Sequence, residues 1–166
     1  QQQLIDEQET NTAIQQRLYQ EISTRRDAEN RVRAENSTRR SAETYLQLFK
    51  NIFDSAIEGI YITDPAGRIL ATNQAFTRIT GYQAMEMNGQ HPMRLASTAQ
   101  IQASFQAMWA ELPRSGSWAG EIWMRKKDGS ICPLWLSVSV IRNERQEITH
   151  YFAFFHDISE LKRKEK

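Results

Sequence analysis

The stretch Gly59-Ile-Tyr-Ile-Thr-Asp-Pro-Ala-Gly-Arg-Ile-Leu-Ala-Thr-Asn-Gln-Ala-Phe76 places a turn between two short runs of alternating residues. Asp, Pro and Gly occupy the first, second and fourth positions of Asp64-Pro65-Ala66-Gly67, where a type I turn prefers them. Isoleucine alternates with other side chains in residues 60–63, and an apolar alternation returns in residues 69–72. The stretch therefore predicts a β-hairpin.

A short helix is predicted directly after this hairpin. Asn73 has the side chain of a helix N-cap, because its amide oxygen can accept from free backbone N–H groups. Phe76, Ile79 and Thr80 follow at helical spacing, and Gly81 ends the pattern as a C-terminal cap. A tight hairpin that leads into a short helix forms one wall of a small domain.

Further elements are predicted downstream. Residues 83–94 are polar and interrupted by glycine and proline, so we expect short turns there. A helix with apolar positions from Ile101 to Leu112 follows, capped by Ser97 or Thr98. Alternating runs in residues 118–126, 130–142 and 148–156 predict three more strands. Five strands joined by hairpins imply an α+β fold, with an antiparallel sheet and its helices packed on one face.

Residues 1–50 differ sharply from the rest of the chain. They contain no Gly or Pro and are rich in Gln, Glu, Arg and Ala, which favour helix. With Leu4 at heptad position a, apolar layers alternate with layers in which Glu precedes Arg by four residues. Residues 21–29 recur as residues 35–43, an offset of two heptads that preserves the seam. The expected seam contains Leu4, Ile14, Leu18, Arg25, Ala28, Val32, Arg39, Ala42, Leu46 and Phe49.

This seam predicts self-association. A helix over residues 4–49 is about 68 Å long, which is too long for the small remaining domain to cover. A parallel coiled-coil homodimer, weakened by its charged layers, is therefore the preferred interpretation. A single solvated helix held by ion pairs is the alternative. A DNA-binding basic region is disfavoured, because residues 1–50 carry eight basic and eight acidic side chains.

Composition restricts the function classes. The 166 residues are 40% hydrophobic and 25% charged, and the net charge of +1 indicates no nucleic-acid partner. The single cysteine, Cys132, excludes an internal disulfide and favours a reducing, cytoplasmic compartment. No apolar run reaches the length of about 18 residues that spans a membrane, although the parent protein could be membrane-anchored. Because the chain begins with Gln1, we expect it to be a fragment of a longer protein.

Catalysis has little support in the sequence. The three histidines, His91, His150 and His156, have no metal-ligand spacing with Cys132 or a carboxylate. No glycine-rich loop that could cradle a phosphate occurs. We therefore expect no enzymatic activity and no metal site in this part of the protein.

An ordered series of motifs supports a family resemblance. The series comprises Ile60-Tyr61-Ile62-Thr63-Asp64, Asn73-Gln74-Ala75-Phe76, Ile79-Thr80-Gly81-Tyr82, Trp118-Ala119-Gly120-Glu121-Ile122-Trp123, Lys127-Asp128-Gly129 and Asp157-Ile158-Ser159. Over about residues 45–160 the chain resembles the PAS domains of bacterial signalling proteins with diguanylate cyclase, phosphodiesterase or histidine kinase outputs. The resemblance implies a five-stranded antiparallel sheet in the order 2-1-5-4-3, with helices that enclose a small-molecule pocket. It also implies homodimers joined through the N-terminal helix.

A ligand pocket is expected between the helices and the inner sheet face. Both faces of residues 134–137 are apolar, so the sequence leaves open whether Leu134 and Leu136 or Trp135 and Ser137 face inward. The other face is expected to contact the N-terminal helix or a second subunit, because exposed apolar strand faces are costly. The expected pocket residues are Phe76, Ile79, Phe105, Trp123, Trp135, Phe152 and Phe154.

The sequence identifies no particular cofactor, and the absence of a cofactor is the preferred interpretation. His91 lies in the region from which some haem-binding relatives supply an axial ligand, so it is a weak candidate for that role. A light-sensing flavin relative would need a cysteine where this chain has Pro92. A redox flavin held among tryptophans stays open, although tryptophans equally suit plain core packing.

The end of the last strand is the expected signal junction. Asp157, Ile158 and Ser159 mark a change from strand to helix, and Asp157 and Ser159 have N-cap chemistry. The expected organisation is a signalling helix over residues 1–44, a PAS domain over residues 45–158 and a linker helix that begins at residue 159 and runs to 166. The expected function is a sensor that relays ligand or partner state to an output domain such as a cyclic-di-GMP synthase or hydrolase. A haem- or flavin-loaded gas or redox sensor and a purely structural dimerisation module are the alternatives.

Overall fold

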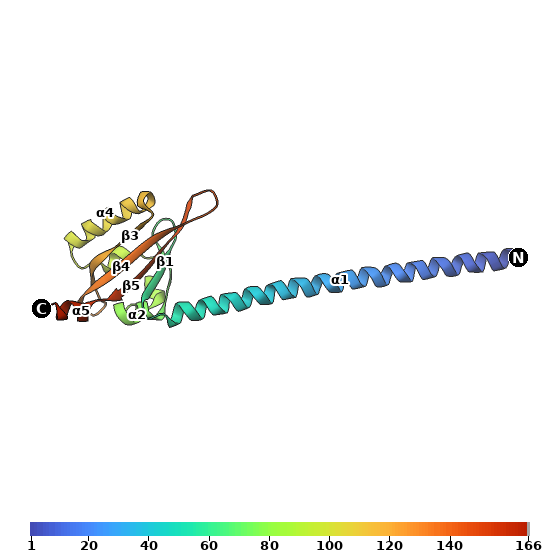
Figure 1. Ribbon diagram of the computed structural model, residues 1–166, viewed down its shortest axis with the longest axis horizontal. Coiled ribbons are helices and arrows are strands. Elements are labelled where there is room, and N and C mark those ends of the chain that lie inside the picture. The colour runs from blue at the N-terminus through green and yellow to red at the C-terminus, as the bar shows by residue number, and fades with distance from the viewer. Residues whose placement is uncertain (166) are drawn as a thin grey trace. The chain divides into compact units, whose positions relative to one another are not determined.

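The computed structural model describes residues 1–165, which form two compact units (Figure 1). The first unit spans Gln1–Phe49, and the second begins at Lys50. The sequence places this boundary after residue 44. The linker helix expected over residues 159–166 is observed as α5, Ser159–Lys164, and residue 166 lies outside the described residues.

The first unit is a single helix. Helix α1 spans Gln2–Ser55, and none of its residues is buried. Because the segment contains neither Gly nor Pro, nothing breaks the ladder of backbone hydrogen bonds. Several threonine hydroxyls donate back to the carbonyl four residues earlier, as Thr38 does to Ala34 at 3.0 Å. The apolar seam side chains are exposed, so this unit buries no core of its own.

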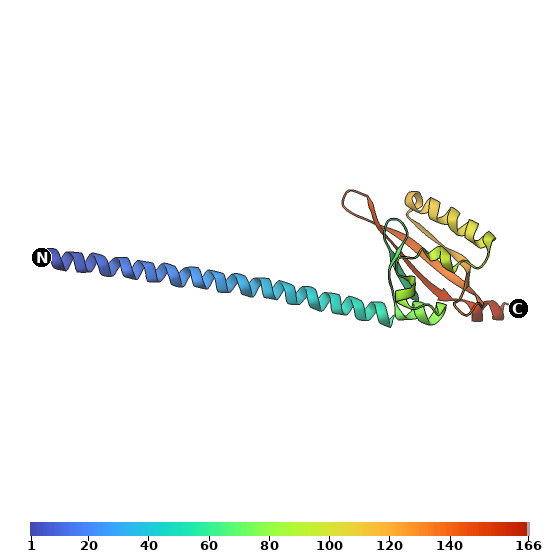
Figure 2. The same cartoon turned by 180° about the vertical axis from the view of Figure 1, so that it is seen from behind.

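The second unit is built on a five-stranded antiparallel sheet. Its strands are β1 (Gly59–Thr63), β2 (Ile69–Thr72), β3 (Ser117–Arg125), β4 (Ile131–Arg142) and β5 (Ile148–Asp157). The order β2-β1-β5-β4-β3 confirms the predicted one. Figure 2 shows that the hairpin between β4 and β5, the two longest strands, extends beyond the neighbouring strand ends.

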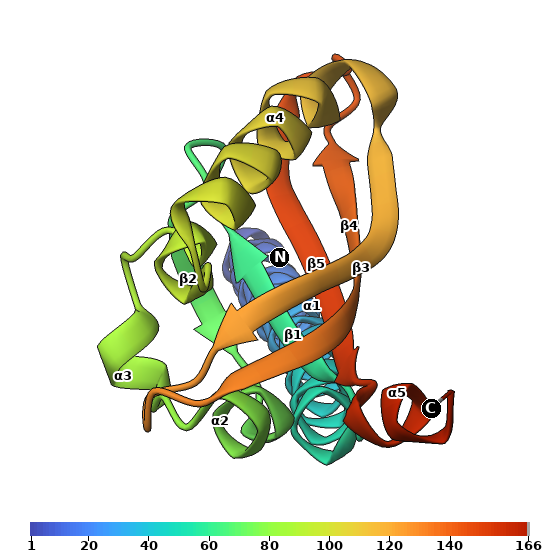
Figure 3. The ribbon, with the colours of Figure 1, turned by 90° about the vertical axis from the view of Figure 1, so that its left-hand side faces the viewer.

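Helices cover one face of this sheet. Helix α4 (Ala99–Ser115) crosses over the strands, as Figure 3 shows, and α2 (Gln74–Thr80) packs against β1. The sequence predicts only turns for residues 83–94, but two single-turn helices form there: α3 (Ala84–Met87) and the 3₁₀ helix η1 (Pro92–Leu95). Both are stabilised by local caps, because the Glu86 carboxylate accepts from the Gln83 N–H and proline occupies the first position of η1.

The hairpin that opens the sheet has the predicted turn chemistry. One carboxylate oxygen of Asp64 accepts from the backbone N–H groups of Ala66 and Arg68, each at 2.9 Å. Gly67 leaves the turn with φ of 87°, a conformation that other residues adopt only at a cost. The turn thus fixes the register in which β1 and β2 pair.

Asn73 joins three parts of the second unit. Its amide oxygen accepts from Phe76 N at 3.0 Å as the predicted N-cap, and also from Ile60 N at 2.8 Å. Its amide nitrogen donates to the carbonyls of Phe53 and Glu58. All of its hydrogen-bonding groups are therefore used, which is what a side chain with only 2% of its surface exposed requires.

Candidate functional site

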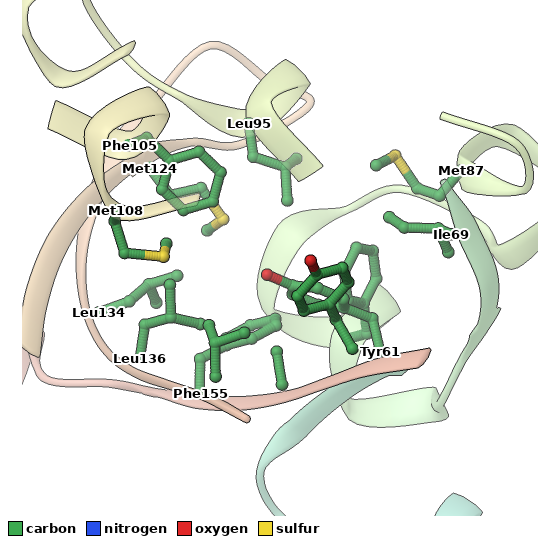
Figure 4. Packing of buried hydrophobic residues seen from close by; sticks show 14 of the residues in the cluster. Tyr61, Ile69, Met87, Leu95, Phe105, Met108, Met124, Leu134, Leu136 and Phe155 are labelled. Atoms are coloured by element: carbon green, nitrogen blue, oxygen red, sulfur yellow. The ribbon is translucent and has the colours of Figure 1, made fainter. Parts of the chain in front are cut away.

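A small cavity of about 30 Å³ lies in the core between the sheet and the helices. From the sheet it is lined by Tyr61, Ile122, Trp123, Met124, Leu134, Leu136 and Phe155. From the helical side it is lined by Pro92, Leu95, Ala96 and Phe105. Figure 4 shows most of these side chains converging from α4, η1 and the strands. The lining is almost entirely apolar.

The indole N–H of Trp123 belongs to a side chain that is 40% exposed, so the one buried and unpartnered polar side-chain group among the lining residues is that of Tyr61. Tyr61 lies on β1 with 2% of its surface exposed, and its hydroxyl has no hydrogen-bond partner among the described residues. Its ring makes an edge contact with Phe76 and a tilted contact with Phe155, with centroids 6.2 and 6.3 Å apart. Burial raises the pKa of the Tyr61 phenol far above its ordinary value, so the hydroxyl stays uncharged.

A second aromatic cluster lies beside the cavity, around Trp109 of α4. The Trp109 ring contacts those of Tyr151 and His91 at centroid distances of 4.7 and 5.0 Å, both edge to face. Its indole N–H is buried without a partner in the described part of the chain. Trp109 is not among the residues that line the cavity, so Tyr61 is the buried and unpartnered donor in its lining.

The Asp157-Ile158-Ser159 segment connects β5 to α5 through several contacts. An Asp157 carboxylate oxygen accepts from Ser159 N at 2.7 Å, and Ile158 N donates to the Pro133 carbonyl at 3.1 Å. Partial burial opposes ionisation of Asp157, but hydrogen bonds from Ser159 and Cys132 together with the charge of Lys126 outweigh this and lower its pKa. Lys162 of α5 forms an ion pair with Glu121 of β3 at 2.8 Å. The segment that leads into α5 is thus fixed to β4 and α5 itself to β3, and both strands contribute to the cavity lining.

A sequence-family model described as the PAS domain matches residues 57–160. The chain belongs to the PAS domain family. This confirms the resemblance stated from the motifs.

Two known proteins with similar sequences are named as a regulatory protein and a signal transduction kinase. The chain is 31% identical over 112 residues to a nitrogen fixation regulatory protein of Klebsiella oxytoca, covering 68% of this chain and 23% of that protein. It is 28% identical over 101 residues to the hybrid signal transduction histidine kinase L of Dictyostelium discoideum, covering 61% of this chain and 6% of the kinase. The chain therefore spans less than a quarter of either relative's length.

A solved structure shows the same fold. The PAS domain of a protein from Colwellia psychrerythraea superposes with a TM-score of 0.64 at 24% sequence identity. The match covers 70% of this chain and 98% of that domain. Taken together, the comparisons show a PAS sensory domain of the kind found in signalling regulators and histidine kinases.

The residues of this PAS domain do not fit a haem or a flavin in the cavity. His91 does not line it, and its Nδ1 accepts from Met93 N at 3.1 Å. Its Nε2 is directed at the hairpin turn, where a β-carbon added to Gly67 would lie 2.7 Å away. A volume of about 30 Å³ accommodates about two or three water-sized groups, far less than either cofactor.

The expected pocket residues fall on two sides of the sheet. Phe105 and Trp123 line the cavity, although Trp123 keeps 40% of its surface exposed. Phe76 lies in the surrounding core, and Ile79 packs against that core. The remaining three do not line the cavity, because strand alternation turns them to the opposite face: Trp135, Phe152 and Phe154.

The register explains this division. Leu134 and Leu136 are buried inward while Trp135 between them is 42% exposed, which answers the question that the sequence left open. On β5, Tyr151, Ala153 and Phe155 are buried. Phe152 and Phe154 pair across the sheet with Ser139 and Ser137 of β4, on the outer face.

The sequence pattern does not indicate Tyr61 as a pocket residue, because its neighbours in β1 are more apolar. Ile60 and Ile62 suggest that their side of β1 faces the core, yet the buried positions of β1 are Gly59, Tyr61 and Thr63. A signal for this face exists at Gly59, since a β-carbon there would lie 2.4 Å from the Phe155 ring. That signal can be used only when Phe155 is already known to point inward.

Within residues 1–165 there is no group of three or more His, Cys, Asp and Glu side chains close enough to hold a metal ion. No helix in the described part of the chain is long and apolar enough to cross a membrane.

Proposed function

We propose that this chain is the sensory module of a longer signalling protein and reports the occupancy of its core cavity to an output domain. The observation that carries the proposal is a PAS core with a small cavity and an unpartnered donor, Tyr61, facing it. An unfilled hydrogen bond at a cavity is what a ligand would satisfy. The contacts of Ile158 with Pro133 and of Lys162 with Glu121 supply a path from the cavity strands to α5.

The output domain in this proposal is a cyclic-di-GMP synthase or hydrolase, with a histidine kinase as the alternative. The PAS resemblance supports the first, and the similarity to histidine kinase L of Dictyostelium discoideum supports the second. The sensory module itself is proposed to be non-catalytic. Its single cysteine supports a cytoplasmic location.

Homodimerisation through α1 is part of the same proposal. Apolar side chains recur along the exposed helix at heptad spacing, and an isolated helix gains nothing from leaving them in water. A parallel pair brings two copies of the sensory unit to the same end of the coiled coil. Ligand-dependent changes in each copy can then bias a shared two-state output.

A second surface supports contact between copies or with another helix. The outer face of the sheet presents Phe152 and Phe154, with ring centroids 6.0 Å apart, beside the half-exposed Trp135. Aromatic side chains gathered on an open sheet face are typical of interaction surfaces.

The test fills the cavity without any ligand. Ala96 lines the cavity in an extended conformation that valine tolerates, so Ala96→Val should occupy part of the space and hold the output of the parent protein in one state. Ala119→Val makes the same change at an exposed position of β3 and should leave the output as it is. A parent protein whose output is unaffected by Ala96→Val, with the variant folded, would argue for the purely structural dimerisation module.

A further inference from the structure

The cavity described above combines a largely apolar lining with one buried and unpaired hydroxyl, that of Tyr61. This inference rests on the proposed sensory function and concerns the chemical class of the ligand. We propose that the cavity binds a neutral molecule of about two or three non-hydrogen atoms that carries one hydrogen-bond acceptor, such as a short ether, aldehyde or alcohol, and that the Tyr61 hydroxyl donates to this acceptor.

The need for an acceptor follows from Tyr61. A phenolic hydroxyl that is buried without a partner has lost its hydrogen bonds to water and gained none in return. Figure 4 shows Tyr61 among the core side chains contributed by the strands and helices, and its ring contacts those of Phe76 and Phe155. No other side chain in the lining carries an oxygen acceptor, so an incoming molecule would supply the hydrogen-bond acceptor that the Tyr61 hydroxyl lacks.

The ligand has to be uncharged. No Lys, Arg, His, Asp or Glu is among the residues that line the cavity. A carboxylate, phosphate or ammonium group would therefore be buried without a counter-charge, which is strongly unfavourable in an apolar site. Tyr61 offers no compensation, because burial keeps its phenol neutral.

Water alone does not fulfil this role well. A buried water typically makes about three hydrogen bonds, and this lining offers a single buried polar side-chain group, because Trp123 is 40% exposed. A small organic molecule satisfies that one group with its oxygen and covers the apolar wall with its methyl or methylene carbons. The side chains of Leu95, Met124 and Leu136 supply that wall.

The test compares three probes with the same number of non-hydrogen atoms: dimethyl ether, propane and formate. Binding is followed by methyl NMR shifts of the isotopically labelled chain, with Met124 as the reporter inside the cavity. Dimethyl ether should bind about tenfold more tightly than propane, as one added hydrogen bond predicts, and formate should not bind.

Two variants test whether the preference for dimethyl ether over propane comes from the Tyr61 hydroxyl. Tyr61→Phe keeps the ring and removes only the unpaired hydroxyl, so the protein should stay folded while dimethyl ether loses its advantage over propane. Tyr151→Phe removes the hydroxyl of another buried tyrosine, one that does not line the cavity, and should keep the advantage.

Three results would overturn the inference: equal affinity for the ether and the hydrocarbon in the unaltered chain, binding of formate, or no shift with any probe. Failure of the proposed function looks different. If dimethyl ether binds through Tyr61 but leaves the output of the parent protein unchanged, the ligand class stands and the sensory role does not.

Discussion

His91 holds the first turn of η1 through its imidazole ring. Nδ1 accepts the Met93 N–H, and the ring packs edge-on against Trp109. Burial lowers the pKa of His91, so the folded protein favours the neutral ring that can accept this bond. Protonation would convert Nδ1 into a donor and remove the cap.

This arrangement makes stability depend on pH. Because the folded state holds the lower pKa, the unfolded chain binds more protons, and stability is lost as pH falls below the ordinary histidine value of about 6.5. We expect Tm to decrease between about pH 7.5 and about pH 5.5 by an amount that corresponds to about 1 kcal/mol, typical of a helix cap. Thermal melts across that pH range measure the change in Tm.

Two asparagine variants distinguish the contribution of His91 to the pH dependence of Tm from that of other titrating groups. His91→Asn can still accept from Met93 but does not titrate, so much of the slope should disappear. His156→Asn changes an exposed histidine at the end of β5 and should retain the slope. If His91→Asn melts with the same pH dependence as the unaltered chain, the cap is not the titrating element.

Gly59 is required by the close approach of the Phe155 ring. A β-carbon at position 59 would lie between 2.4 and 2.9 Å from three ring atoms, and the ring is itself fixed against Phe76 at a centroid distance of 5.6 Å. We expect Gly59→Ala to lower the free energy of unfolding by about 1–3 kcal/mol, as overpacking does. Denaturant unfolding measures the change.

A double-mutant cycle identifies the cause. Phe155→Leu shortens the side chain that blocks position 59, so Gly59→Ala should cost less in that background than in the unaltered chain. If the cost of Gly59→Ala is the same in both backgrounds, its effect comes from backbone conformation rather than from the ring.

At the scale of elements, the hairpin and the sheet order could be predicted because their signals are local. Asp64 and Gly67 specify the turn, Asn73 specifies the start of α2, and the motif series specifies the fold. The cavity could not be predicted in the same way. Trp135 is as apolar as its buried neighbours Leu134 and Leu136, so polarity does not reveal which face points inward. Only the long-range pairing of β4 with β5 decides it.

The charged layers of α1 set the strength of the proposed dimer. In a parallel pair, position a of one chain faces position a of the other, and d faces d. Arg39 therefore faces Arg39 of the second chain, and Glu35 faces Glu35. Arg39→Leu should therefore tighten the dimer about tenfold, because an apolar pair replaces a like-charge layer. Arg40→Leu, one position outside the seam, is the matched control and should change the dissociation constant little. Analytical ultracentrifugation of the unaltered chain and the two variants measures the dissociation constant of each dimer.

Salt dependence tests the orientation of the same pair. Screening weakens repulsion between like charges, so a parallel dimer should tighten between about 0.05 M and about 0.5 M salt. In an antiparallel pair, position a faces d, and the seam would place Arg25 against Glu21. A dimer that weakens as salt rises would thus contradict the parallel arrangement.

At the scale of the whole molecule, the sensory proposal needs a connection between the cavity and the chain beyond α5. Leu134 lines the cavity, and the neighbouring Pro133 carbonyl accepts from Ile158 N at 3.1 Å. Asp157 then fixes the first residue of α5 through Ser159 N. A shift of β4 on ligand binding would therefore reach α5 through one backbone hydrogen bond and one carboxylate-to-backbone hydrogen bond, without the need for a long side-chain network.

Asp157→Ala in the full-length protein tests this connection. The variant loses the bond to Ser159 N but leaves the cavity lining intact, so binding of a core ligand should persist while the output no longer responds to it. Asp128→Ala is the matched control, because Asp128 makes the same kind of bond, to Ser130 N at 2.9 Å, in the turn between β3 and β4. Output measured with and without dimethyl ether, alongside Tm for both variants, separates coupling from stability. A response that survives in Asp157→Ala at unchanged Tm would show that the signal leaves the domain by another route, and α1 would then be the element to examine.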